Sequence, residues 1–161
     1  MSLHVVFALA GVEYALPVAY VLQMDTFSGA TPVPGTADYV AGIVTVRGRV
    51  VPVIDLRRRF GLPPVAPTLD TRIIVTQVED RVVGLCVDRA REVLALDPTK
   101  HQAAPALVSE RSVGLVQGMH ALGTRLLLLL DLPKVLSEHG HDHEPLALLT
   151  DDAHDRPALP G

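Results

Sequence analysis

Two runs of β-branched residues around a tight turn constrain the fold of this chain more than any other feature. Ile43–Val46 and Val50–Ile54 flank the turn dipeptide Arg47-Gly48. β-Branched side chains pack well on a pleated sheet, and glycine accepts the positive φ angles that tight turns require. The pattern therefore predicts a β-hairpin with Arg47 at its tip.

The second strand of this hairpin leads into a short helix. Asp55 follows Ile54 directly and is a suitable N-cap for a helical turn over Leu56–Phe60. Pro52 interrupts the strand. Because proline cannot donate a ladder hydrogen bond, we expect Pro52 at a sheet edge or a bulge.

Short apolar runs separated by turn residues continue along the chain, with a stiff linker over residues 61–67. Several short strands at this spacing favour an all-β fold built from small barrels. The first set of predicted strands is Val5–Leu9, Val12–Pro17, Val21–Met24, Ile43–Val46 and Val50–Ile54. The second set is Arg72–Val78, Val82–Val87, Glu92–Leu96, Leu115–Met119 and Arg125–Leu130.

The two halves of the chain resemble each other. Val50–Ile54 ends in Asp55-Leu56, and Leu126–Leu130 ends in Asp131-Leu132 before a predicted C-terminal helix over Pro133–Glu138. This repetition predicts two similar units. The alternative is coincidence, since a strand followed by a cap and a helix is a common junction.

Composition excludes several classes of protein. A net charge of −4 argues against binding nucleic acid through general electrostatics. The single cysteine, Cys86, cannot form an internal disulfide, lies in an apolar run, and is expected to be a buried, inert thiol. The longest leucine run, Leu126–Leu130, is far shorter than the ~20 residues that span a bilayer. We expect a soluble, cytoplasmic protein.

No catalytic signature stands out, so we expect neither an enzyme nor a cofactor. Arg57–Arg59 form a basic run that we interpret as a solvated helix face rather than a nucleic-acid patch. Residues 139–161 are rich in histidine and aspartate and are predicted to be a flexible tail. His139, His141 and His143 could bind a divalent metal ion, but their spacing suits a flexible tail, and we predict no metal site.

The hairpin also carries a family resemblance. Gly42 and Arg47-Gly48, followed by Val51–Leu56, resemble the signature of CheW-type chemotaxis coupling proteins. Further similarity brings the match to roughly residues 4–137. The other matching segments are Tyr14–Pro17 with Val21, Thr31–Gly35, Tyr39–Gly42, Val83–Asp88, Glu92–Leu94, Gly114–Gly118 and Leu126–Leu136.

The resemblance implies a fold and its division into subdomains. It implies two five-stranded β-barrels packed side by side around a shared apolar core. The expected domain covers residues 1–138, with one subdomain over about 12–62, a second over about 68–130, and terminal segments packing across.

The resemblance also implies a function. Such a protein is a non-catalytic adaptor that couples methyl-accepting chemoreceptors to a CheA-type histidine kinase. Its expected partners are the cytoplasmic tip of a receptor and the regulatory domain of the kinase, and it would meet the membrane only through receptor arrays. The implied receptor-binding residues are Val21, Gly42, Val46 and Arg47; the kinase-binding residues are not assigned.

Each of these residues also has a structural interpretation. Arg47 could be a solvated turn residue or the ion-pair partner of Asp25 or Asp55. Val21 could belong to the core, and Gly42 could end a helix or allow a close backbone approach. The chain departs from the common family pattern at Gln23, where a glutamate is frequent.

Two alternative functions remain open at this point. The same fold could serve a chemosensory-like pathway that controls pili, development or second messengers. A small barrel could instead bind oligonucleotides, which requires aromatic side chains exposed on a basic face.

Overall fold

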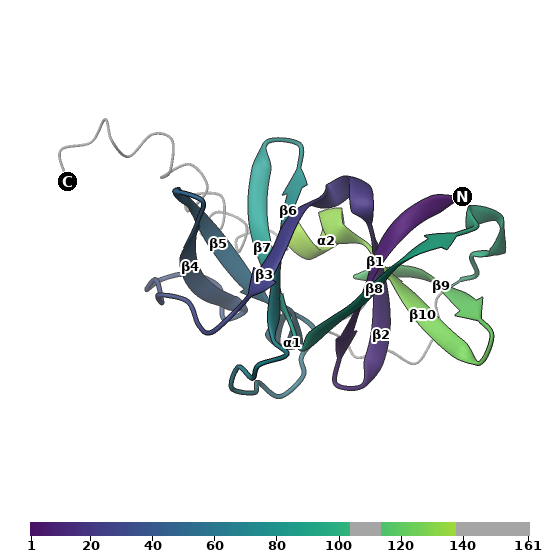
Figure 1. Cartoon of the computed structure of the whole chain (residues 1–161). Helices are drawn as coiled ribbons and strands as arrows, with labels where there is room; N and C mark the ends of the chain where they lie inside the picture. Colours follow the sequence, from purple (N-terminus) through teal and green to yellow (C-terminus); the bar gives the residue numbers. More distant parts are fainter. Residues whose placement is uncertain (104–113, 138–161) are drawn as a thin grey trace.

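The computed structural model describes residues 1–103 and 114–137, which form ten strands in two five-stranded sheets (Figure 1). Sheet I has the strand order β3-β6-β7-β5-β4, and sheet II has the order β8-β1-β2-β10-β9. Sheet I contains β3 (Val21–Thr26), β4 (Val40–Val46), β5 (Arg49–Asp55), β6 (Arg72–Val78) and β7 (Arg81–Val87). Sheet II contains β1 (Ser2–Leu9), β2 (Val12–Pro17), β8 (Arg89–Leu96), β9 (Val116–Leu122) and β10 (Arg125–Leu130).

The two sheets repeat the same topology, as the sequence predicts. Each sheet consists of three antiparallel strands joined through one parallel pair to a hairpin. In sheet I the parallel pair joins β5 to β7, with Val53 opposite Gly84. In sheet II it joins β10 to β2, with Leu127 opposite Glu13. The two five-stranded units of the predicted all-β fold are therefore confirmed.

The sheets do not follow the expected subdomain boundaries of about 12–62 and about 68–130. β6 and β7 belong to the same sheet as β3, β4 and β5, while β1 and β2 join β8, β9 and β10. The difference arises at the two parallel pairs, because they join strands that lie far apart in sequence. Hairpins are visible in the local sequence pattern, whereas such long crossover connections are not.

A helix cap at an aspartate follows the last strand of each hairpin. Asp55 Oδ1 accepts a hydrogen bond from the backbone N–H of Arg57 (3.0 Å), which begins α1 (Leu56–Arg59) as predicted. Asp131 Oδ1 accepts one from Lys134 N–H (3.2 Å) at the start of α2 (Leu132–Leu136). The helix expected over residues 133–138 thus begins one residue earlier and ends at Leu136, because Ser137 is already extended; residue 138 lies outside the described residues. The described residues also contain two 3-10 turns, η1 (Val18–Tyr20) and η2 (Pro98–Lys100).

Pro52 lies in an interior strand but at a point where β5 pairs with β4 alone, so the expected edge position holds locally. β5 pairs with β4 on one side and with β7 on the other, but its pairing with β7 begins only at Val53. A two-residue hairpin makes Val46–Arg49 a hydrogen-bonded pair, and alternation then makes Ile43–Pro52 a non-hydrogen-bonded pair. The missing N–H of Pro52 therefore leaves no ladder bond unmade.

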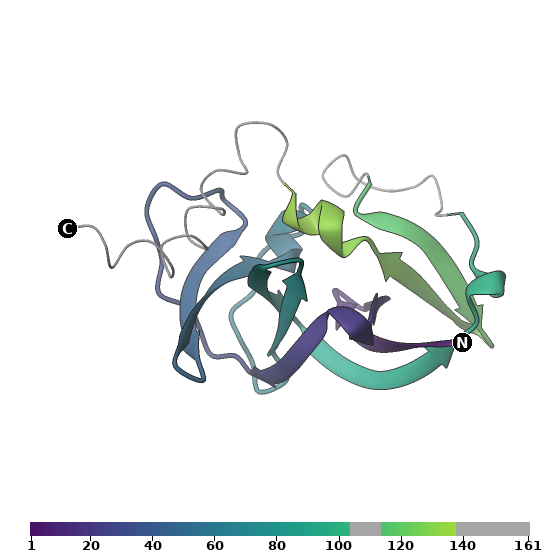
Figure 2. The same cartoon turned by 90° about the horizontal axis from the view of Figure 1, so that it is seen from above.

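The two sheets share one apolar core, and each sheet also curves around a smaller cluster of its own (Figure 2). In the shared core the Tyr14 ring stacks on Phe7 and meets Phe60 edge to face, with ring centroids 5.6 and 5.3 Å apart. The cluster inside sheet I comprises Phe27, Val51, Val53, Ile73, Val75 and Val82. The cluster inside sheet II comprises Val6, Ala15, Leu96, Leu127 and Leu129.

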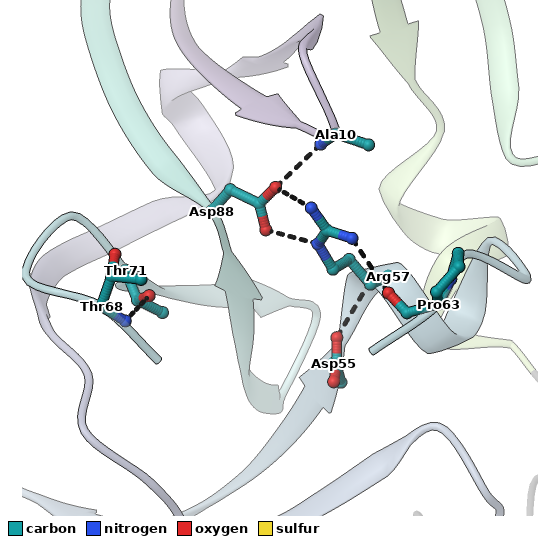
Figure 3. A network of polar contacts seen from close by, with 7 residues as sticks. All are labelled: Ala10, Asp55, Arg57, Pro63, Thr68, Thr71 and Asp88. Atoms are coloured by element: carbon teal, nitrogen blue, oxygen red, sulfur yellow. Dashed lines mark hydrogen bonds and ion pairs between the residues drawn. The ribbon is translucent and has the colours of Figure 1, made fainter. Parts of the chain in front are cut away.

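Two of the three arginines of α1, Arg57 and Arg59, hold the two halves together, which contradicts their interpretation as a solvated face, whereas Arg58 is exposed as expected. Arg59 is buried and donates to the carbonyls of Lys134, Val135 and Ser137 at the end of α2. Arg57 pairs with Asp88, the residue between β7 and β8, and Asp88 also accepts from Ala10 N–H (Figure 3). The run therefore lies at the junction of the two sheets, where its charges find carbonyl and carboxylate partners.

Candidate functional site

The predicted hairpin places Arg47 at an exposed tip. Arg47 and Gly48 have φ angles of 51° and 78° between β4 and β5, as a two-residue type I′ turn requires. The Arg47 side chain is exposed, and the neighbouring Val46 is partly buried. The turn is therefore fixed by its backbone, while the guanidinium extends into solvent.

Arg47 and Arg49 differ from the other arginines in the described part of the chain. Neither has a hydrogen bond or ion pair within residues 1–103 and 114–137. The other described arginines donate to acids or carbonyls. The two acids considered as partners of Arg47 have other contacts: Asp55 pairs with Arg58, and Asp25 accepts a hydrogen bond from Gln23. Arg47 therefore does not form either of the intramolecular pairs considered from the sequence. Within the described ranges, its charge is not neutralised by a carboxylate contact.

A large hollow of about 810 Å³ lies between the two edge strands of sheet I, β3 and β4. Its walls mix polar side chains of both strands with the loop that follows β3. The hollow is lined by Gln23, Asp25, Thr26, Phe27, Ser28, Gly29, Ala30, Thr31, Ile43, Val44, Thr45, Val46, Arg47 and Ile73.

A smaller hollow of about 290 Å³ opens beside it and reaches apolar side chains of the sheet I cluster. Gln23, Val46 and Arg47 line both hollows and so form the ridge between them. The smaller hollow is lined in addition by Leu22, Arg49, Val51, Val75 and Val82.

Gly42 precedes Ile43, which lines the large hollow, and allows the loop after β3 to approach β4. A Cβ at Gly42 would lie 2.1 Å from the carbonyl oxygen of Thr31, and the φ angle of Gly42 is 142°. Thr31 and Ile43 exchange two backbone hydrogen bonds of 2.9 Å at this point. Of the structural interpretations of Gly42, the close backbone approach is the one observed.

Val21 is separate from the two hollows. It is partly buried and packs against the shared core, and it lines neither hollow. The next residues of β3 lie at the hollows: Leu22 is 50% exposed, and the Gln23 side-chain amide donates to Asp25. Of the four residues implied by the resemblance, the structure brings Val46 and Arg47 together at the hollows, whereas Gly42 lies further along β4 and lines neither hollow.

Leu22, Asp25 and Arg49 line these hollows but were not predicted from the sequence. The half exposure of Leu22 is seen only in the structure, because an apolar residue in a predicted strand is indistinguishable from a core residue in the sequence. Asp25 and Arg49 have no signal in the sequence either. Their position follows from the approach of β3 to β4.

The surroundings offer binding rather than chemistry. Burial, followed by the nearby charges of Asp55 and Asp88, raises the pKa of the Cys86 thiol to about 12, as expected for an inert cysteine.

No group of three or more His, Cys, Asp or Glu side chains in the described segments has the geometry of a metal site. No described helix is long and apolar enough to cross a membrane. The tail over residues 139–161 lies outside the described residues.

The aromatic residues decide against an oligonucleotide-binding barrel. All three phenylalanines, Tyr14 and Tyr39 are buried, and Tyr20 is partly buried against the shared core. Base stacking requires aromatic faces open to solvent. None of these rings provides such a platform.

Comparison with known proteins agrees with the resemblance. The model of the CheW-like domain matches residues 3–140. The chemotaxis protein CheW of Bacillus subtilis is 35% identical over 136 residues, covering 84% of this chain and 87% of that protein. CheW of Klebsiella aerogenes is 33% identical and covers 82% of this chain and 80% of its own length.

A solved structure has the same fold. The crystal structure of the scaffolding protein TtCheW from Thermoanaerobacter tengcongensis superposes with a TM-score of 0.78 at 28% identity. The match covers 88% of this chain and 96% of that one. With its paired five-stranded sheets and its matched length, the chain belongs to the CheW family of non-catalytic scaffold proteins of bacterial chemotaxis.

Proposed function

We propose that this protein couples methyl-accepting chemoreceptors to a CheA-type histidine kinase. Family membership supports a scaffold role in chemotaxis. The observation that carries the proposal is Arg47, which has no ion-pair partner among residues 1–103 and 114–137 and lies on the ridge between the two hollows of sheet I. An exposed cation beside apolar side chains is typical of a reversible protein interface.

The receptor tip is the partner that we assign to this surface. The receptor tip is a helical hairpin, which presents its side chains on a narrow convex surface. A groove between two edge strands can bind such a surface. Arg47 would pair with a carboxylate of the receptor, while Val46 and Leu22 would contact apolar side chains. Gly42 acts indirectly, because it positions the loop that forms one wall of the large hollow.

The kinase is assigned to a second surface, at the end of a barrel, where a similarly folded regulatory domain of the kinase can pair with this chain. Separate surfaces are necessary because one adaptor has to hold both partners at once. The protein would therefore act in the cytoplasm and reach the membrane only through receptor arrays. Signals would pass through differences in how tightly the adaptor binds the two states of the kinase.

The test is binding of a purified receptor cytoplasmic tip to the intact chain. We expect Arg47→Glu to weaken this binding at least about tenfold, since a charge-assisted hydrogen bond is replaced by repulsion. Lys100→Glu makes the same change of charge on an exposed side chain of η2 and should bind normally. Equal binding by the wild type and Arg47→Glu would reject this receptor surface.

The coupling itself is tested by affinity capture from the native cell. The wild-type chain should recover a receptor and a kinase together, whereas Arg47→Glu should recover the kinase alone. Loss of both partners in this variant would argue against two separate surfaces.

A further inference from the structure

Three histidines gather at one end of sheet II, away from the hollows of sheet I. His4 belongs to β1, His101 follows η2, and His120 belongs to β9. The His101 ring meets both others edge to face, with centroids 6.2 Å from His4 and 5.2 Å from His120. Three segments that are distant in sequence therefore meet through imidazole rings.

Two rings of the cluster are buried, His101 is partly exposed, and the hydrogen bonding of the rings is incomplete. His4 and His120 are only 5% and 3% exposed. His101 Nε2 and His120 Nδ1 are buried without a hydrogen-bond partner among the described residues. A buried ring nitrogen without a partner tolerates the neutral state far better than the protonated state, which needs two acceptors.

The histidines flank a pair of backbone hydrogen bonds, here called a clip, that joins Gln102 to Met119 of β9. Gln102 and Met119 exchange two hydrogen bonds of 2.9 Å, and each is adjacent in sequence to a histidine of the cluster. A Cβ on Gly118 would lie 2.7 Å from the Gln102 carbonyl oxygen, so the two backbones are in close contact. Disturbing the rings must therefore disturb this clip.

The same clip occurs in sheet I without histidines. Thr31 and Ile43 exchange two hydrogen bonds of the same length, and Gly42 makes the corresponding close approach. The repeated topology makes the two clips equivalent. The chain thus contains an internal control in which the geometry is retained and the titratable rings are absent.

We propose that the His101 ring, packed edge to face against His4 and His120, is a proton-operated latch: the neutral ring holds the clip between Gln102 and Met119 closed, and its protonation opens the clip. A proton is a better candidate than a metal ion for this cluster. No group of three ligating side chains in the described part of the chain has metal-binding geometry.

Charges of both signs lie near the cluster among the described residues. They are Asp97, which caps η2, Lys100 on η2, and the N-terminal amine ahead of β1. The cross-strand neighbours of His4 and His120 on β8 and β10 are Leu94 and Leu127, which carry no charge. Burial, then His120 and His4, lower the pKa of His101 against the opposing effect of Asp97.

The lowered pKa of His101 determines how the stability of the clip depends on pH. Once the clip opens, the pKa of His101 returns towards its ordinary value of about 6.5, so the open state binds more protons. The clip is therefore most stable above pH ~6.5 and weakens as pH falls below that value.

Hydrogen exchange of single backbone amides tests the proposal on the intact chain. Protection of the Gln102 and Met119 amides is measured at pH 7.5 and pH 5.0, after correction for the intrinsic exchange rate. We expect a loss of about tenfold at pH 5.0, with the Thr31 and Ile43 amides unchanged. Unchanged protection at Gln102 and Met119, or an equal loss at both clips, would overturn the latch.

A variant without the central ring provides the second test. His101→Asn removes both ring contacts while keeping a polar side chain. In this variant, the protection of the Gln102 and Met119 amides should fall less than about threefold between the two pH values. A loss as large as that of the wild type would overturn the proposal. Titration of the three ring resonances in the wild type adds an independent readout: His101 should have a midpoint below 6.5, and an unshifted midpoint would also count against the latch.

Discussion

Arg57 and Asp88 form a bidentate ion pair that joins helix α1 to the point where the chain passes from sheet I to sheet II. Arg57 Nε lies 2.8 Å from Asp88 Oδ1, and Nη2 lies 2.7 Å from Oδ2. Asp88 Oδ2 also accepts from Ala10 N–H at 2.8 Å, which brings in the β1–β2 turn. One carboxylate thus connects three segments, and Arg57 adds a fourth through the Pro63 carbonyl (Figure 3).

Asp88→Asn should lower the free energy of unfolding by about 1–2 kcal/mol, because hydrogen bonds to a partly buried charged group are weakened and Arg57 loses its counter-charge. Asp70→Asn is the matched control. Its pair with Arg89 is 3.3 Å long and more exposed, and surface pairs contribute about 0–1 kcal/mol. Urea unfolding at pH 7 measures both variants. Equal losses in the two would show that the Asp88 network has no special role in stability.

Acid should destabilise the protein in part through Glu13. The hydrogen bond from Arg125 lowers the pKa of Glu13 despite its partial burial, and the charges of Arg125 and Arg91 act in the same direction. A depressed carboxyl pKa stabilises the fold above the unfolded-state value near 4.5, and this contribution disappears as pH falls through the folded-state pKa. Thermal unfolding of Glu13→Gln should therefore depend less on pH below 4.5 than that of the wild type.

The control for this experiment is Glu79→Gln, which removes an exposed turn carboxylate that has no ion pair among the described residues. Its stability should follow the wild-type curve down to pH 3. If Glu13→Gln follows the same curve, the Arg125–Glu13 contact does not contribute to acid stability.

The hairpin and the capped helices could be predicted from the sequence because they depend on neighbouring residues. Arg47-Gly48 specifies its own turn, and Asp55 caps the helix that follows it directly. The assignment of strands to sheets could not be predicted, because the β5–β7 and β2–β10 pairs join strands that are distant in sequence. Local periodicity contains no information about such pairings.

The candidate site shows the same division between local and distant information. Val46 and Arg47 are adjacent in the hairpin and were assigned to one surface from the sequence alone. Gln23 joins them only because β3 and β4 are the two edges of one curved sheet. The burial of Arg59 was also not predictable, since its partners are carbonyls of α2, which lies more than 70 residues later in the chain.

Gly42→Ala should be strongly destabilising, with a loss of about 3 kcal/mol or more. The new methyl would lie 2.1 Å from the Thr31 carbonyl oxygen at a φ angle of 142°, so the Thr31–Ile43 clip would have to open. Gly48→Ala meets no atom within 4 Å and carries only the conformational penalty of its φ angle of 78°, about 1 kcal/mol.

Urea unfolding gives the two free energies, and amide exchange of Ile43 reports on the clip directly. Ile43 should lose protection in Gly42→Ala and keep it in Gly48→Ala. Similar free-energy losses in the two variants would contradict the assigned role of the close approach.

Arg59→Lys should cost about 2–3 kcal/mol although it keeps the positive charge. Arg59 uses its planar guanidinium to donate to three carbonyls near the end of α2 while its Cζ lies 4.7 Å from the centre of the Tyr39 ring. A lysine ammonium cannot reproduce this fork, so buried carbonyls would lose their donors. Arg58→Lys, at an exposed position of the same helix, should cost less than about 0.5 kcal/mol.

Cys86 should react slowly with thiol reagents in the folded protein. Burial is the main cause that raises its pKa to about 12, so the thiolate is scarce at pH 7.5. We expect modification at least about a hundredfold slower than in the unfolded chain, where the ordinary pKa near 8.5 applies. A colorimetric disulfide reagent measures both rates, and denaturation should release one reactive thiol per chain, in agreement with the single cysteine. A folded-state rate close to the unfolded one would mean that the cluster inside sheet I opens readily, because Cys86 packs against that cluster.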